Sequence, residues 1–353
     1  MKVRSNELMA LQHRCEIMEA GHLYSAQRLV GELGRGLGLD ETLLRKLDSL
    51  AAQCAALLLV DQGRGELLVR SLSDVAAFQG RRYGVELLVI RSGAYAADVP
   101  DLTQPLSGHA DELDIWCQPG QGIALRAVIW SLPGRTDEAP IPSMPYGVIS
   151  LPIRGEVVSG DAWSFHVGDL DVTVLVADGL GHGPLANRAA TEAATVLLEN
   201  ADEPLDRIVH LAHGALRETV GAAIGVARVP VSTGASSGRA TFVGVGNVSA
   251  SACTEQSHKH LASHDGVVGH SMRRVQEFEV DCPGNSLFVM HSDGLSARWD
   301  LSRYAGLAVR HPALTAAVLY RDFARSRDDV TVFVYRVGRR STDSVCAVGA
   351  TIS

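Results

Sequence analysis

The sequence contains no Cys-x-x-Cys pair, and its six cysteines stand far apart along the chain. Closely spaced cysteine pairs mark zinc sites and disulfide frameworks, so we expect neither here. Scattered thiols are typical of proteins that work in a reducing cytoplasm. The six are Cys15, Cys54, Cys117, Cys253, Cys282 and Cys346.

Long apolar runs are also absent. The most apolar stretch, residues 50–60, has 11 residues and includes Gln53, whereas a helix needs roughly 20 apolar residues to cross a bilayer. The first 15 residues lack the apolar segment of a secretion signal. The sequence therefore predicts a soluble protein located in the cytoplasm.

A surplus of positive charge is the third absence, because the formal net charge is −8. Nucleic acids and anionic membranes select basic surfaces, so we expect neither as a partner. What is present is ordinary globular composition, with 46% hydrophobic and 20% charged residues. A chain of 353 residues is long enough for two or three domains.

The first half, residues 1–135, mixes helical and strand patterns. Apolar residues recur at helical spacing before Gly38, and Asp40 stands where a second helix would be capped. Pro119-Gly120 is strong turn chemistry between two apolar runs, which predicts a hairpin. The predicted helices cover 25–37, 40–59 and a segment ending near 110–113, and the predicted strands cover 66–70, 85–90, 114–117 and 123–130. This order predicts an α/β sandwich.

Three segments of this half share a resemblance. They are GLDETLLRKLDSLAAQ (38–53), GVELLVIRSG (84–93) and DELDIWCQPGQG (111–122). At these segments the chain resembles the anti-sigma regulatory Ser/Thr kinases of the GHKL ATPase superfamily, over about residues 20–130. The resemblance implies a GHKL-like α/β sandwich.

The residues that would hold a nucleotide in that family are changed here. The family has a Glu and a magnesium-binding Asn at the positions of Ser49 and Gln53. Its adenine-reading Asp is replaced by Arg91, and one close-approach glycine by Tyr95. The segment 98–113, where the Gly-rich lid would lie, holds one glycine. We therefore expect a degenerate domain that binds no ATP and serves docking or regulation, and a purely structural role stays open.

A proline-rich stretch divides the chain. Prolines interrupt helices and sheet ladders, so residues 136–146 are predicted to be a linker. Residues 338–353 are polar and small and are expected to be disordered. Between them, at 147–337, many antiparallel strands and paired helices predict a β-sandwich with helices on its outer faces, which makes the whole chain α+β.

The predicted elements of this second domain can be stated by range. Strands are expected over 146–152, 156–159, 163–167, 172–177, 221–229, 240–248, 249–253, 274–279, 286–291 and 330–337. Helices are expected over 184–200, 204–219 and 314–323.

Acidic residues stand at the ends of the apolar strands in this domain. The set is Asp161, Asp178, Asp293, Asp328 and Asp329, with a glycine beside each of the first three. One Asp-Gly alone is a common turn, but carboxylates drawn into one cleft repel each other and need a cation. Two Mg²⁺ or Mn²⁺ ions would neutralise them and lower the pKa of a bound water, which could then attack a phosphorus atom.

The second domain also carries seven motifs in a fixed order. They are GDAW, VADGLGHGPLANRAA, TVGAAIGVARV, VGVGNVSA, SHDGVVG, HSDGLSARWDL and DDVTVFVYR. In this order they resemble the bacterial SpoIIE-type protein phosphatases of the metal-dependent Ser/Thr phosphatase family (PPM), in particular its RsbX-type branch. The resemblance covers about residues 147–336 and implies a PPM-type β-sandwich flanked by helices.

The resemblance also implies roles for the acidic residues. Asp178 would bridge both metal ions, and the backbone carbonyl of Gly179 would bind one of them. Asp293 and Asp328 would hold the other ion, and Asp161 would bind directly or through water. The family motif has one ligand in the Asp328-Asp329 pair. We favour Asp328, and Asp329 would then cap the start of its strand.

Three further residues have two interpretations each. His182 would protonate the leaving serine or threonine oxygen, or it is a loop histidine bonded to backbone. Arg154 would bind the phosphate through its guanidinium group, or it is a plain surface arginine. For Asn247 we favour a buried amide that satisfies a neighbouring turn.

The sequence thus predicts a cytoplasmic Mg²⁺- or Mn²⁺-dependent phosphoserine/phosphothreonine protein phosphatase with a degenerate kinase-like domain in front. By resemblance, its substrate would be a phosphorylated STAS-domain protein in partner switching or a stressosome that controls an alternative sigma factor. A cognate anti-sigma kinase would be a further partner. Two alternatives stay open: a bifunctional kinase and phosphatase with ATP in the first half, and a binding scaffold whose metal site is dead.

Overall fold

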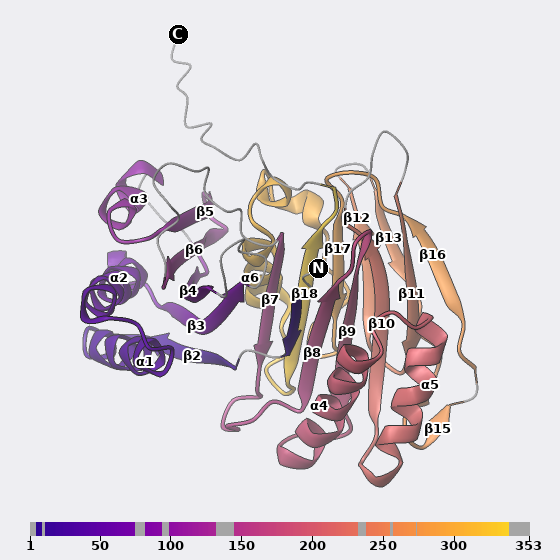
Figure 1. Ribbon diagram of the computed structural model, residues 1–353. Helices are drawn as coiled ribbons and strands as arrows, with labels where there is room; N and C mark the ends of the chain where they lie inside the picture. The colour runs from indigo at the N-terminus through magenta and orange to yellow at the C-terminus, as the bar shows by residue number, and fades with distance from the viewer. Residues whose placement is uncertain are drawn as a thin grey trace.

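The computed structural model describes residues 5–8, 11–74, 82–93, 99–131, 145–231, 238–254, 257–272 and 274–338 (Figure 1). Nearly all of the predicted linker and tail lie outside these residues, as does Tyr95. None of the helices in the described part of the chain combines the length and the hydrophobicity that a membrane-spanning segment requires.

The first half forms a two-layer α/β sandwich, as predicted. Helices α1 (His22–Gly36) and α2 (Glu41–Leu59) cover one face of an antiparallel sheet and share an apolar core with it. Asp40 accepts hydrogen bonds from the backbone N–H groups of Thr42 and Leu43, which confirms the predicted cap. The sheet order is β2 (Gln12–Ile17), β3 (Gly65–Asp74), β4 (Arg82–Arg91), β6 (Gly122–Trp130) and β5 (Glu112–Gln118).

Two details of this half differ from the prediction. Helix α3 (Val99–Ser107) ends before residues 110–113, because Glu112 already begins β5. Strand β2 was not predicted, and it pairs with β3 at the edge of the sheet. A short 3₁₀ turn, η1 (Val60–Gln62), follows α2.

The second half is a β-sandwich of two antiparallel sheets, as predicted. One sheet has the order β1 (Ser5–Leu8), β8 (Asp161–Val167), β9 (Asp171–Gly179), β10 (Ala222–Pro230), β11 (Arg239–Val245) and β16 (Glu277–Asp281). The other has the order β13 (His258–Leu261), β12 (Ser249–Cys253), β17 (Leu287–His291), β18 (Val330–Arg336) and β7 (Tyr146–Leu151). An aromatic-rich core fills the space between them. Strand β1 pairs with β8, so residues 5–8 belong to this half although they precede the first.

Helices cover the sandwich on both sides. Helices α4 (Pro184–Glu199) and α5 (Leu205–Ala215) pack on the β8–β11 sheet through an alanine-rich face. Helix α6 (Pro312–Phe323) packs on the opposite sheet. The remaining short elements are β14 (Gly266–Val267), β15 (Ser271–Met272), η2 (Leu216–Glu218), η3 (Leu301–Arg303) and η4 (Leu307–Val309).

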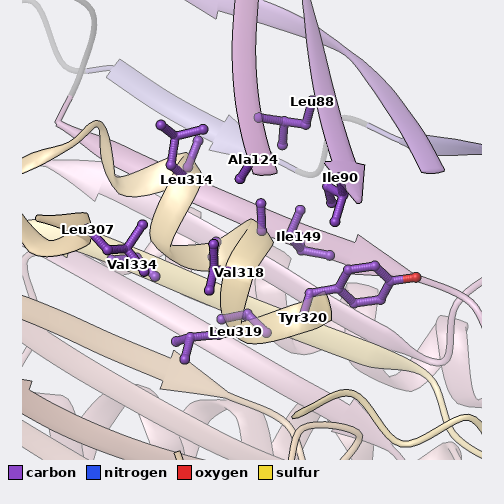
Figure 2. Packing of buried hydrophobic residues seen from close by; sticks show 14 of the residues in the cluster. Leu88, Ile90, Ala124, Ile149, Leu307, Leu314, Val318, Leu319, Tyr320 and Val334 are labelled. Atoms are coloured by element: carbon purple, nitrogen blue, oxygen red, sulfur yellow. The ribbon is translucent and has the colours of Figure 1, made fainter. Parts of the chain in front are cut away.

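Helix α6 is not on an outer face, which corrects the prediction. Nine consecutive residues, from Pro312 to Tyr320, are buried, as expected of a helix covered all round. On one side it contacts the first-half sheet through Leu88 and Ala124, and on the other it contacts Ile149 and Val334 (Figure 2). The two halves therefore share one apolar core, and Figure 1 shows α6 between their sheets.

Residues 156–159, predicted as a strand, form a loop. Side chains rather than a neighbouring strand bind the backbone here. Asp329 accepts hydrogen bonds from the backbone N–H groups of Ile153 and Gly160, and Ser159 Oγ accepts one from Asp161. Such side-chain bonds compete with a sheet ladder, and they fix this loop beside the acidic residues.

Candidate metal centre

Two of the predicted aspartates face each other across the β8–β9 hairpin. The antiparallel register pairs Asp161 directly with Asp178, and directly paired residues project from the same side of a sheet. Asp161 is 1% exposed, and its Oδ2 accepts a hydrogen bond of 2.6 Å from Ser292 Oγ. Burial, followed by the negative charge of Asp178, raises the pKa of Asp161.

Asp178 also lies near carboxylates that arrive from the other sheet. Burial, and then the negative charges of Asp293 and Asp328, raise the pKa of Asp178 to about 7. Burial and Asp293 likewise raise the pKa of Asp328. Carboxylates repel strongly only at short range. The structure therefore brings together four of the predicted acidic residues from adjoining strand ends.

Glycines allow these strand ends to approach so closely. A Cβ atom at Gly179 would overlap the carbonyl oxygen of Ala186 at the start of α4. A Cβ atom at Gly294 would overlap the carbonyl oxygen of Asp329. Only glycine fits at either position, which explains why a glycine follows Asp178 and Asp293.

The two adjacent aspartates before β18 have different surroundings. Asp329 is 3% exposed, and its two carboxylate oxygens accept separate backbone hydrogen bonds, each 2.8 Å long, from Ile153 and Gly160. Asp328 is half-buried and accepts a hydrogen bond from the backbone N–H of Asp329. Asp328 therefore keeps lone pairs for another partner, whereas those of Asp329 are largely used by the protein.

The other two candidates stand outside the carboxylate cluster. His182 is exposed, and its Nδ1 lies 3.0 Å from Glu156 Oε1. Arg154 forms ion pairs with Glu16 and Glu66, both of the first half. His182 is thus bonded to a side chain rather than to backbone, and Arg154 links the two halves rather than standing as a lone surface residue.

Two residues around the cluster were not assigned to it from the sequence. Asn247 was expected to be a buried amide that satisfies a turn, but it is exposed, and its Nδ2 donates a 2.6 Å hydrogen bond to Asp293 Oδ2. Ser292 binds Asp161, and its Oγ also accepts the backbone N–H of Thr331. Asn247 precedes β12 and Ser292 follows β17, and these strands pair. A polar residue at the end of each strand was the available signal.

The donor set fits a hard divalent cation. All the clustered side chains are carboxylates, and burial together with repulsion from neighbouring carboxylates raises the pKa of Asp161, Asp178 and Asp328. Within the described ranges, no three His, Cys, Asp or Glu side chains are close enough to enclose an ion by themselves. Mg²⁺ takes one or two carboxylates and keeps several waters, so ligands spread over several segments suit it.

Sequence comparison gives one curated relative at low identity, and no protein-family model matches the chain. The phosphoserine phosphatase RsbX of Bacillus subtilis (strain 168) is 23% identical over 150 residues, which cover 42% of this chain and 73% of that protein. The chain is thus similar to a phosphoserine phosphatase over part of its length.

Comparison with solved structures gives similar chains. One comes from a structural study of the bacterial stressosome, with 26% identity, coverage of 54% of this chain and 98% of that one, and a TM-score of 0.49. RsbX in complex with magnesium has 20% identity, coverage of 54% and 93%, and a TM-score of 0.46. The catalytic domain of the serine/threonine phosphatase PstP in complex with two manganese ions has 17% identity, coverage of 54% and 96%, and a TM-score of 0.42.

Proposed function

We propose that this chain is a Mg²⁺- or Mn²⁺-dependent phosphatase that removes phosphate from phosphoserine or phosphothreonine in a protein. The observation that carries the proposal is the convergence of Asp161, Asp178, Asp293 and Asp328 at adjoining strand ends. Buried carboxylates that repel each other gain stability when a cation binds between them. The sequence similarity to RsbX supports the same assignment.

Each residue of the cluster has a role in this proposal. Asp178 would hold both ions, the backbone carbonyl of Gly179 would bind one of them, and Asp293 and Asp328 would bind the other. Asp161 would bind directly or through water. Bound ions supply a water of lowered pKa and neutralise charge on the phosphoryl oxygens. Ser292 orients Asp161, and Asn247 orients Asp293, through the hydrogen bonds described above. Asp329 holds the neighbouring loop in place rather than binding an ion.

We also propose His182 as the group that protonates the leaving oxygen. It lies in the glycine-rich loop that follows Asp178, and Glu156 would orient its ring. Replacement with asparagine should reduce kcat for a protein substrate, whose leaving group is a poor one, more than kcat for p-nitrophenyl phosphate. Equal effects on the two substrates would contradict this role.

The test of the proposed activity is hydrolysis of p-nitrophenyl phosphate with added Mn²⁺. We expect metal-dependent turnover that falls by at least about a hundredfold in Asp178→Ala, because the bridging carboxylate is lost. Asp206→Ala, at an exposed position of α5, is the matched control and should retain activity. Unchanged activity in Asp178→Ala would refute the metal assignment.

For the first half we propose a docking role toward a STAS-domain substrate or its kinase, without ATP. The side chain of Arg91 supports the absence of ATP binding. It is 6% exposed, and its Nη1 donates a hydrogen bond of 2.8 Å to the carbonyl of Val60 at the end of α2. By the resemblance to the GHKL kinases, Arg91 stands where that family has the Asp that would read adenine. Calorimetric titration of the full chain with ATP should show no heat, and a measurable affinity would favour the bifunctional alternative.

A further inference from the structure

A cleft of about 290 Å³ lies between the two halves of the molecule, next to the carboxylate cluster. Its lining includes Asp328 itself and Ile153, whose backbone binds Asp329. The remaining wall comes from β2, the start of β3 with the residue before it, the end of β4, the turn after β7, the end of α6 with the residues that follow it, and the start of β18. The cleft therefore opens directly beside one of the proposed metal ligands.

The cleft is basic although the chain is acidic. Among its lining residues, five arginines against two carboxylates, Glu66 and Asp328, give a formal charge of 5 − 2 = +3, whereas the whole chain carries −8. The five are Arg14, Arg64, Arg154, Arg321 and Arg325. A cleft lined by one sign of charge concentrates ligands of the other sign.

Three of these arginines are held by the protein. Arg14 donates to Tyr320 and to the carbonyl of Pro152, and Arg321 donates to Asp322. Arg154 pairs with Glu66, whose other oxygen accepts from the Tyr320 hydroxyl. These bonds leave Glu66 little capacity to neutralise a further cation and tie the two halves together along the cleft.

The other two arginines, Arg64 and Arg325, are exposed. Among the residues that the structure describes, neither guanidinium group has a hydrogen-bond or ion-pair partner. Arg64 belongs to the first half, just before β3, and Arg325 to the second, just after α6. Each half therefore contributes one available guanidinium group to the cleft.

We propose that this cleft binds an acidic segment of the protein substrate, next to its phosphorylated residue, with Arg64 and Arg325 as the main contacts. The inference rests on the proposed phosphatase function. Asp328 both lines the cleft and lies near Asp178, so the cleft gives the residues that flank the phosphorylated side chain a place to bind. Because the two guanidinium groups come from separate halves, they suit carboxylates that are spaced along a peptide. A single compact phosphate would instead need donors that converge on one point.

The test compares two phosphoserine peptides on the full chain with Mn²⁺, one with acidic and one with neutral flanking residues. The wild type should have about tenfold higher kcat/KM for the acidic peptide, and the preference should shrink with added salt. In Arg64→Glu/Arg325→Glu the preference should disappear or reverse. The control Arg207→Glu/Arg217→Glu changes the net charge equally at exposed positions of α5 and η2, and should keep the preference.

A second measurement separates this inference from the proposed function. Fluorescence anisotropy of an unphosphorylated acidic peptide should show binding to the wild type and loss in the cleft variant, with unchanged circular dichroism. Binding without any phosphatase activity would refute the function and keep the cleft. Activity without preference for the acidic peptide, or equal loss in the control, would overturn the cleft proposal. The cleft proposal would also be overturned if inorganic phosphate competed with the peptide while the acidic flanking residues added nothing to its binding.

Discussion

At the scale of single residues, Asp328 and Asp329 show how neighbours of the same type take different roles. Asp329 uses both oxygens to hold Ile153 and Gly160, which fixes the loop that leads into Asp161. Asp328 is bound by one backbone N–H and otherwise lies near the other carboxylates. Asp329 is therefore built into the fold, and Asp328 remains available to a ligand.

These different surroundings predict that the same substitution has a different effect at each of the two aspartates. Asp329→Asn should lower the free energy of unfolding by about 2–3 kcal/mol, because one backbone N–H would then face an amide donor in a buried site. Asp328→Asn should leave stability nearly unchanged without metal and weaken Mn²⁺ activation of p-nitrophenyl phosphate hydrolysis. Urea unfolding and metal titration measure the two effects. If Asp328→Asn alone caused a large loss of stability, the structural and the metal-binding roles of the two aspartates would have to be exchanged.

At the scale of elements, the site depends on where helix α6 sits against the sandwich. Strand β7 crosses α6 so closely that a Cβ atom at Gly147 would overlap the backbone of Ala313. Neither strand nor helix can shift freely, because α6 is also packed against the first-half sheet. Gly214 offers the contrast, since a Cβ atom at this position of the outer helix α5 would meet open space.

Alanine should therefore act in opposite directions at these two glycines. Gly147→Ala should destabilise the protein by about 3 kcal/mol through overpacking against backbone. Gly214→Ala should stabilise it by about 0.5–1 kcal/mol, because alanine costs less conformational entropy in a helix and meets no neighbour there. Chemical unfolding of both variants checks this. A neutral Gly147→Ala would show that β7 and α6 are not closely packed.

At the scale of the whole molecule, a buried charge network lies on the face of the first sheet that meets α6. Leu88 and Ile90 pack against α6, and strand alternation places Glu86 on the same face. Glu86 is 1% exposed and accepts 2.6 Å hydrogen bonds from both Arg70 and Arg126. Although burial opposes it, the positive charges of these arginines lower the pKa of Glu86 to about 2.

The network predicts a specific acid sensitivity. Because the folded-state pKa of Glu86 lies below that of the unfolded chain, its contribution is fully present above about pH 4.5 and is lost as pH falls toward 2. Glu86→Gln should cost about 3–5 kcal/mol at pH 7, since two buried arginines lose their shared charge partner. Urea unfolding between pH 2 and 7 measures both. A parallel pH dependence in wild type and variant would contradict the role of Glu86.

Local sequence signals were enough to predict many parts of this protein. Alternation, turn residues and the cap at Asp40 indicated the two α/β layers and most strands, because these signals act between near neighbours in the chain. Apolar strands ending in Asp-Gly indicated the acidic residues of the site, because a strand end fixes where a side chain emerges. The ligand assignments themselves remain predictions.

How these parts meet became visible only in the folded chain. The burial of α6 on both sides, the pairing of β1 with β8 and the bond from Asn247 to Asp293 join residues far apart in the sequence. Local patterns carry no information on such contacts, because the same apolar helix can lie on an outer face or between two sheets. For the same reason the basic cleft appears only once both halves are packed around α6.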